Sequence, residues 1–207
     1  MRRLLHVGSG RKRKNQTTEA FDTPEWFEIR LDIDPDVRPD IVASITDLAP
    51  VPDASVNAVF SSHNIEHLYP HEAGLALREF QRVLTPDGFL IITCPDLQEV
   101  AEAVARGNLT EPLYESSQGP IAPIDILYGH GAAMAAGNLH MAHRGGFTLR
   151  SMAEAIETAG FGARLGARRT TFFELWFVAS REEMSREALA DLAAAHFPPM
   201  RKPITTI

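Results

Sequence analysis

The sequence predicts an α/β protein with a doubly wound, mostly parallel sheet and a long insertion after the fourth or fifth strand. Short apolar runs recur along the chain, and the first of them, residues 4–8, ends directly in glycine, as a buried parallel strand can. Segments with helical periodicity separate these runs, and such alternation is typical of a parallel sheet with helices on both faces. Residues 108–147 are rich in Gly, Pro, Ala and His and mark the insertion.

The first half of the chain supplies most of the expected strands. Apolar runs predict strands at residues 4–8, 27–33, 56–61 and 89–95, and a short strand or extended segment at residues 41–45. Apolar residues at spacings of two to four predict a helix over residues 71–84, and the TPDG sequence at residues 85–88 is expected to end it with a turn. The first crossover helix is expected to be short or missing because the stretch after residue 10 carries few apolar anchors.

The insertion follows a short capped helix. Asp96 is expected to cap the start of this helix and Gly107 its end. We interpret residues 108–147 as a long loop with one short helix that forms a substrate lid, because structureless loops of this length are uncommon unless they bind something.

The end of the chain predicts two more helices and one strand. Thr148 is expected to cap a helix that runs to Ala159 and is closed by Gly160. A terminal strand is expected over residues 170–179, and Ser180 with Glu183 predicts a capping box for a helix over residues 181–197. The tail beyond this helix is expected to be ordered only if it docks.

Size and composition indicate one globular domain. The 207 residues, 44% hydrophobic and 23% charged, suit a domain over residues 1–180 with a C-terminal helix and tail over residues 181–207. The single cysteine, Cys94, lies in an apolar run and is expected to be a buried, inert thiol. No apolar segment approaches the length of about 18 residues that a membrane span needs, so a cytoplasmic protein without a membrane partner is expected.

A glycine turn follows the first strand. Gly8, Ser9 and Gly10 would allow backbone N–H groups to approach a ligand closely, although a plain turn at the end of a strand is the alternative. The third glycine of a dinucleotide-binding fingerprint is missing, because Arg11 follows Gly10 directly. This absence argues against a nucleotide-dependent oxidoreductase.

Acidic residues follow the second strand. Asp32 ends this strand 24 residues after Gly8, near the separation of about 20 residues expected for a carboxylate that binds ribose hydroxyls. We expect the Asp32 carboxylate to be exposed at the strand end, and Asp34 lies on the same loop as a second candidate. A solvated loop carboxylate is the alternative.

Further motifs in residues 4–96 resemble those of class I S-adenosylmethionine-dependent methyltransferases. The chain has DASVNAVFSSHNIEH at residues 53–67 and EFQRVLTPDG at residues 79–88. These motifs are similar to a pattern in the group that includes ubiquinone and menaquinone C-methyltransferases and many small bacterial enzymes. The resemblance implies a Rossmann-like sheet of the seven-stranded type, S-adenosylmethionine as cofactor, and transfer of a methyl group to a small-molecule acceptor.

The resemblance also implies roles for individual residues. Glycines 8 and 10, with Ser9 between them, would pass beneath the methionine and ribose of the cofactor, and Asp32, or Asp34 in its place, would bind the ribose. Asp47 would accept from the adenine amino group while Leu48 packs on the ring. Ser62 and His63 would line the methionine end of the cofactor, and Arg82 and Gly88 would have structural roles.

Three positions depart from the family pattern. His6 stands where the family usually has an acid that orients the cofactor amino group, Arg11 replaces the third glycine, and Asn57 replaces an aspartate. A neutral histidine can accept one hydrogen bond, whereas a protonated one would repel the amino group. These departures favour the alternative hypothesis, a noncatalytic binding or regulatory protein on the same fold with a degraded cofactor loop. The intact Asp32, Asp47 and Glu66-His67 favour an active methyltransferase.

Histidines supply the candidate catalytic bases. Small bacterial relatives often carry His-[Lys/Arg]-x-x-aromatic before the next helix, and this chain has His143-Arg144-Gly145-Gly146-Phe147, so His143 or His140 is the candidate in the insertion. His67 is a further candidate because its family position is often near the cofactor. The alternative is that these side chains have a structural role and stabilise the loops through hydrogen bonds to the backbone.

No metal is expected from the sequence. A site made of His130, His140 and His143 is a weak alternative, because spacings of ten and three without a cysteine or an evident carboxylate are nonspecific.

The expected partner is a small molecule. Residues 11–14 (RKRK) form either a solvated basic loop or a site that receives an anionic group of the acceptor. Nucleic acid is disfavoured because the whole chain has a net charge of −7. A monomer or a homodimer is expected.

Overall fold

The computed structural model describes residues 1–199 and contains a seven-stranded sheet of order β3-β2-β1-β4-β5-β9-β8. Strands β1 to β5 pair in parallel, and β9 runs antiparallel to both β5 and β8, which confirms the predicted mostly parallel α/β fold. The strands of this sheet are β1 (Arg2–Val7), β2 (Trp26–Asp32), β3 (Ile41–Val42), β4 (Val56–Ser62), β5 (Leu84–Pro95), β8 (Ala163–Arg169) and β9 (Glu174–Ser180).

Six α-helices, five 3-10 helices and a small hairpin complete the described part of the chain. The α-helices are α1 (Pro70–Val83), α2 (Leu97–Ala105), α3 (Pro123–Tyr128), α4 (Gly131–Ala135), α5 (Leu149–Thr158) and α6 (Arg186–His196). The 3-10 helices are η1 (Lys14–Gln16), η2 (Glu19–Phe21), η3 (Pro35–Val37), η4 (Ile65–His67) and η5 (Leu139–Met141), and the hairpin is β6 (Tyr114–Ser116) with β7 (Gly119–Ile121). None of these helices is long and apolar enough to cross a membrane.

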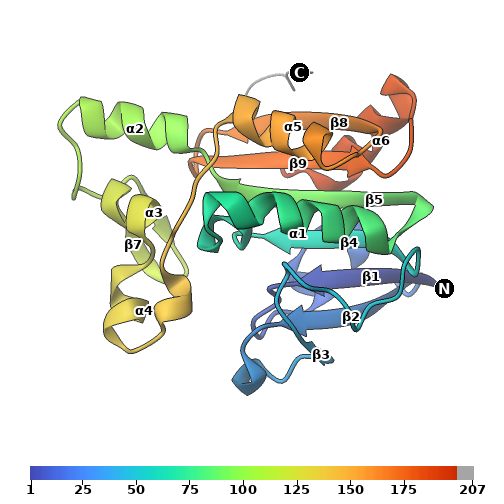
Figure 1. The fold of residues 1–207 in the computed structure, drawn as a ribbon. Helices are drawn as coiled ribbons and strands as arrows, with labels where there is room; N and C mark the ends of the chain where they lie inside the picture. Colours follow the sequence, from blue (N-terminus) through green and yellow to red (C-terminus); the bar gives the residue numbers. More distant parts are fainter. Residues whose placement is uncertain (200–207) are drawn as a thin grey trace.

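Both faces of the sheet are covered. Figure 1 shows α1 and α5 on one face, where Phe80 and Met152 are fully buried. On the opposite face α6 packs with η2, and Phe21 lies against Trp26 and His196 with ring centroids 5.0 and 4.4 Å apart. Elements from the two ends of the described chain therefore cover this face together. The first crossover, between β1 and β2, contains two 3-10 helices and no α-helix, as expected.

The helix near the C-terminus begins later than predicted. Ser180 does not cap it, because this residue pairs with Phe89 and Ala163 as the last residue of β9, and its hydroxyl donates to the Glu182 carbonyl. The cap is Ser185, whose hydroxyl accepts from the N–H of Ala188 at 3.2 Å. The predicted capping box of Ser180 and Glu183 is therefore wrong. Most of the predicted tail lies outside the described residues.

Two further differences concern strands. Residues 170–173, predicted as part of the terminal strand, form the turn before β9. The edge strand β8 was not predicted because its arginines interrupt the apolar pattern. The TPDG sequence does not separate α1 from the next strand. It lies inside β5, where the register jumps from the Val56–Leu84 pair to the Ala58–Phe89 pair, so the predicted turn is an irregularity of the strand.

The insertion is more ordered than predicted. Instead of one short helix it contains the β6–β7 hairpin, α3, α4 and η5. A Cβ atom on Gly129 would lie 2.0 Å from the Met141 carbonyl oxygen, which shows how closely two of its segments approach. Figure 1 places α3 and α4 beyond the carboxyl ends of the parallel strands, where ligands bind in open α/β sheets.

The packing of α6 predicts a destabilisation in acid. Burial, with the nearby charge of Arg2, lowers the pKa of His196 from 6.5 to about 4, and its Nδ1 lies 2.7 Å from the Thr18 hydroxyl. The unfolded chain therefore binds a proton at this residue more tightly than the folded chain. The contribution of neutral His196 to the free energy of unfolding is complete above pH 6.5 and is lost as the pH falls towards 4, by up to roughly 3 kcal/mol.

We expect urea unfolding to show a lower free energy of unfolding at pH 4.5 than at pH 7. The loss should be smaller in His196→Asn, whose amide can still reach the Thr18 hydroxyl. An equal loss in both proteins would show that other groups cause the acid sensitivity.

Candidate active site

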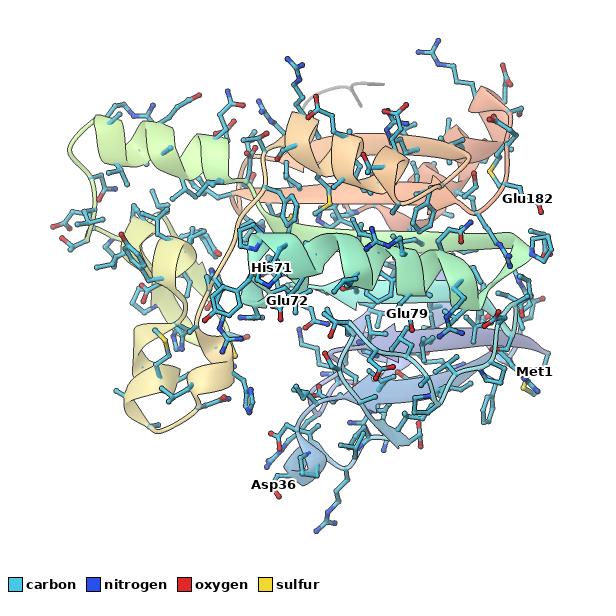
Figure 2. The ribbon with its side chains drawn as sticks, viewed as in Figure 1. Met1, Asp36, His71, Glu72, Glu79 and Glu182 are labelled. Atoms are coloured by element: carbon cyan, nitrogen blue, oxygen red, sulfur yellow. The ribbon has the colours of Figure 1, made fainter. Side chains whose placement is uncertain are left out.

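A cleft of about 240 Å³ runs along the carboxyl ends of β1, β2 and β4, at the point where the strand order reverses. In Figure 2 the labels of Asp36, on the turn after β2, and of His71 and Glu72, at the start of α1, help to locate these strand ends. Of the residues predicted to bind the cofactor, five line this cleft. They are Gly8, Gly10, Asp32, Asp34 and His63.

The turn after β1 requires its glycines for different reasons. Gly8 and Gly10 have φ values of +57° and +53°, and residues with a Cβ atom rarely adopt such backbone angles. A Cβ atom on Gly8 would lie 2.3 Å from Nδ2 of Asn64, so a side chain would collide with the loop after β4. A Cβ atom on Gly10 would meet nothing within 4 Å, which leaves open space beside the cleft.

Asp32 connects the turns that follow β1 and β2. Its Oδ2 accepts from the N–H of Gly10 at 2.7 Å, and its Oδ1 accepts from the N–H of Asp34 at 3.0 Å. The residue is only 9% exposed, which corrects the expectation of an exposed carboxylate. Each carboxylate oxygen has a further lone pair, so the group can both hold the turns and accept from a ligand.

The other predicted cofactor residues are not among the described residues that line the cleft. Asp47 accepts from the N–H of Ala49, and Leu48 is fully buried. Ser62 accepts from the hydroxyl of Thr93, and Ser9 is 2% exposed. Their predicted roles would require contacts other than those seen along the cleft.

His6 does not line the cleft and has a carboxylate partner. Its Nδ1 lies 2.8 Å from Oε1 of Glu28 on β2, and its ring meets Phe60 edge-on. Burial lowers the pKa of His6 more than Glu28 raises it, so the ring is neutral at pH 7 and Nδ1–H donates to Glu28. Glu28 thus places an acid beside the position where the family pattern has one.

His63 is held between two carboxylates. Its Nε2 lies 3.1 Å from Glu174, its Nδ1 lies 3.4 Å from Glu66, and its φ of +50° is unusual for a side chain of this size. Burial opposes its protonation, but the hydrogen bonds and charges of Glu174 and Glu66 raise the pKa of His63 to about 10. The cleft therefore carries an imidazolium at neutral pH.

Glu66 is the most deeply buried acid of this group. It is 1% exposed, and neither carboxylate oxygen has a hydrogen-bond partner among the described residues. The 3.4 Å contact with His63 is an ionic contact that lacks the geometry of a hydrogen bond. Burial raises its pKa, but the neighbouring His63 imidazolium lowers it more, so Glu66 stays ionised.

A second cavity of about 140 Å³ adjoins the cleft. The two spaces share His63, His67 and Met141. The walls come from the insertion and from the turn before β9, with Tyr114 packed edge-on against Phe172 and nearly parallel to Phe173. We call this second cavity the chamber.

The structure brings together two of the three candidate bases. His67 and His143 have ring centroids 4.9 Å apart and both line the chamber, whereas His140 lines the cleft. Nδ1 of His67 lies 3.1 Å from the Ala142 carbonyl, and Nδ1 of His143 lies 2.7 Å from the Ile126 carbonyl. Because a carbonyl only accepts, both Nδ1 atoms carry the proton.

Several residues of this site were not predicted from the sequence. Glu174 and Phe173 were assigned only to an apolar strand, although an acid inside such a run is unusual and was the available signal. Tyr114 had no signal because its role depends on the folding of the insertion.

Comparisons with known proteins agree with this architecture. Residues 7–92 match the family described as a methyltransferase domain. No curated protein matches the chain in sequence.

Solved structures share the fold at low sequence identity. A protein from Pyrococcus horikoshii OT3 is 15% identical, with 87% of this chain and 82% of that chain covered and a TM-score of 0.59. A SAM-dependent methyltransferase from Archaeoglobus fulgidus is 14% identical, with 86% of each chain covered and a TM-score of 0.54. The 1,6-didemethyltoxoflavin-N1-methyltransferase of Burkholderia thailandensis, solved with 1,6-didemethyltoxoflavin and S-adenosylhomocysteine, is 17% identical, with 87% and 71% covered and a TM-score of 0.53. The chain therefore has the Rossmann-like methyltransferase fold.

The charge on His63 predicts a stability that depends on pH. Since its pKa is raised in the folded chain, its contribution is complete below pH 6.5 and is lost as the pH rises through about 10. The side chain is 43% exposed, so solvent screening should reduce the effect to roughly 1 kcal/mol.

We expect the free energy of unfolding of wild type to exceed that of His63→Gln by more at pH 6 than at pH 10. The exposed His71, which Figure 2 labels on α1, supplies the control variant His71→Gln. A difference that does not change with pH would contradict the ionised His63.

Proposed function

We propose that the chain transfers a methyl group from S-adenosylmethionine to a small-molecule acceptor held in the chamber. The observation that carries the proposal is the junction of two spaces at His63, His67 and Met141. One space has the backbone turns and carboxylates that suit a nucleoside, and the other has aromatic walls and polar groups that suit a small acceptor. The match of residues 7–92 to a methyltransferase domain supports the same function.

The cleft fits the proposed cofactor. The open space beside Gly10 gives the cofactor's methionine and ribose access to the backbone, and Asp32, with Asp34 as the second candidate, would accept from the ribose hydroxyls. The apolar side chains of Val37 and Ile45 line the same cleft and would contact the adenine. When bound, S-adenosylmethionine supplies a methyl carbon to which the acceptor forms a bond, while the sulfonium sulfur keeps the electron pair of the broken C–S bond.

His143 is the proposed base. With its proton on Nδ1 towards the Ile126 carbonyl, its Nε2 lone pair can accept a proton from the acceptor. Burial lowers the pKa of His143 more than the charge of Glu66 raises it, so the ring is neutral at pH 7. His67 has the same tautomer and lines both spaces, and it would orient the acceptor there.

The acceptor is proposed to be a small molecule, and the aromatic walls of the chamber favour one with a planar or apolar part. The basic run lines neither space among the described residues, and Lys14 instead donates to the carbonyls of Thr23 and Trp26. An anionic group on the acceptor is therefore proposed from the positive charges of His63, which lines both spaces, and of Arg144, which lines the cleft.

The contact between His6 and Glu28 weakens the alternative of a noncatalytic binding protein. The substitution of His6 for an acid suggested a degraded site, but Glu28 supplies a carboxylate beside that ring. Absence of S-adenosylhomocysteine binding by the folded protein would favour the noncatalytic alternative, whereas only the enzyme would form methylated product.

A glycine substitution tests the cofactor cleft. We expect Gly10→Ala to weaken the binding of S-adenosylhomocysteine, measured by isothermal titration calorimetry, by at least tenfold, because the methyl group enters the space beside the cleft. Gly107→Ala is a matched control, since Gly107 also has a positive φ and no atoms within 4 Å of its Cβ position but lies at the end of α2. Each variant should lose about 1–2 kcal/mol of stability from backbone strain. Equal binding by the two variants would place the cofactor elsewhere.

A carboxylate substitution tests the ribose assignment. Asp32→Ala should abolish detectable binding of S-adenosylhomocysteine and lower the free energy of unfolding by about 2–4 kcal/mol, because two backbone N–H groups lose their acceptor. The fold should survive, as checked by circular dichroism. Normal binding by Asp32→Ala, together with loss of binding in Asp34→Ala, would transfer the ribose role to Asp34.

A further inference from the structure

Three potential metal ligands meet at the chamber wall. Glu66, His67 and His143 each offer one ligand atom, and these three atoms lie within 4.8 Å of one another. All three residues line the chamber, and they come from η4 and from the loop before α5. We propose that they bind a divalent first-row transition metal ion, such as Zn²⁺, through two histidines and one carboxylate.

The hydrogen bonds of both histidines leave a lone pair on the second ring nitrogen. Nδ1–H of His67 donates to the Ala142 carbonyl and Nδ1–H of His143 donates to the Ile126 carbonyl. Nε2 is therefore the atom that each ring can offer to a metal ion. A backbone carbonyl on the second nitrogen is the usual arrangement around metal-bound histidine, where it fixes the tautomer and the orientation of the ring.

The buried Glu66 carboxylate has no hydrogen-bond donor among the described residues. Both of its oxygens are buried without a hydrogen-bond partner among the described residues, and burial of an unpaired carboxylate is strongly unfavourable. In the tautomer that their backbone hydrogen bonds fix, His67 and His143 offer it Nε2 lone pairs rather than protons. His63 supplies positive charge at 3.4 Å, but it is also engaged by Glu174. A cation between the three acceptors would satisfy all of them.

The backbone fixes the ligand segments at short range. The N–H groups of Arg144 and Gly145 donate to the Glu66 carbonyl at 2.9 and 3.1 Å, and the N–H of His143 donates to the Tyr128 carbonyl. Metal bonds of about 2.0–2.2 Å place ligand atoms roughly 3–4 Å apart, so side-chain rotations would close the remaining distance.

The proposed ion would face the chamber and leave coordination positions open there. Three protein ligands with an open position are typical of catalytic rather than structural zinc sites. This part of the inference rests on the proposed function and changes one role in it, because an Nε2 atom of His143 that binds the ion no longer acts as the base. An oxygen of the acceptor would occupy an open position, where the ion lowers the pKa of a hydroxyl or holds a carboxylate. The acceptor class would then be small molecules with such an oxygen donor.

The test uses untagged full-length protein freed of metal with a chelator, and Co²⁺ as the probe, in the absence of any cofactor. We expect one equivalent of Co²⁺ to bind and to give the visible absorption of a coordinated ion, with Zn²⁺ as competitor. His143→Asn and His67→Asn should weaken binding at least tenfold, and Glu66→Gln should do the same where it folds. His130→Asn is the matched control, because His130 lines the same chamber outside the three-residue group.

The outcomes separate this inference from the proposed function. Absence of stoichiometric Co²⁺ binding, or equal binding by wild type and His143→Asn, would overturn the metal site. An equal loss in His130→Asn would also overturn it, because the three-residue group would not be the ligand set. Calorimetry with S-adenosylhomocysteine tests the cofactor cleft independently, so a metal site without cofactor binding would refute only the methyl-transfer proposal.

Discussion

The buried carboxylate of Glu66 is the constraint on which the candidate site depends. An ionised group that is 1% exposed needs compensating charge, and the imidazolium of His63 supplies it from the end of β4. The same residue organises the insertion through its backbone, because its carbonyl accepts from the N–H groups of Arg144 and Gly145. One residue therefore places the cleft, the chamber and the insertion relative to one another.

The two spaces are built in different ways. The cleft is formed by backbone turns at the ends of parallel strands, where positive φ angles at Gly8 and Gly10 and the carboxylate of Asp32 set its shape. The chamber is formed by side chains of the segment after β4, of the insertion and of the turn between β8 and β9. The insertion and this turn have little local pattern. A common fold can thus keep one cofactor cleft while the acceptor chamber varies with its loops.

The parts of the site that depend on short motifs were predictable. The glycine turn and Asp32 follow strands with clear apolar patterns, and the structure places both at the cleft. Asp47 and Leu48 were assigned by the family pattern alone, and the described residues that line the cleft do not include them. The grouping of Glu66 with His143 has no local signal, because the two residues are far apart in sequence and meet only when the insertion folds back.

The sequence by itself determined the elements whose signals lie within a few residues: the parallel strands, α2 between Asp96 and Gly107, and α5 after Thr148. The tertiary structure decided the rest. Polar β8 is a strand because β9 offers it a free edge, and Ser180 extends β9 instead of capping a helix because both of its neighbouring strands pair with it. Local patterns fix backbone conformation over one or two turns, whereas edge pairing, caps in competition with strands and clusters of buried charge depend on partners that only the folded chain brings together.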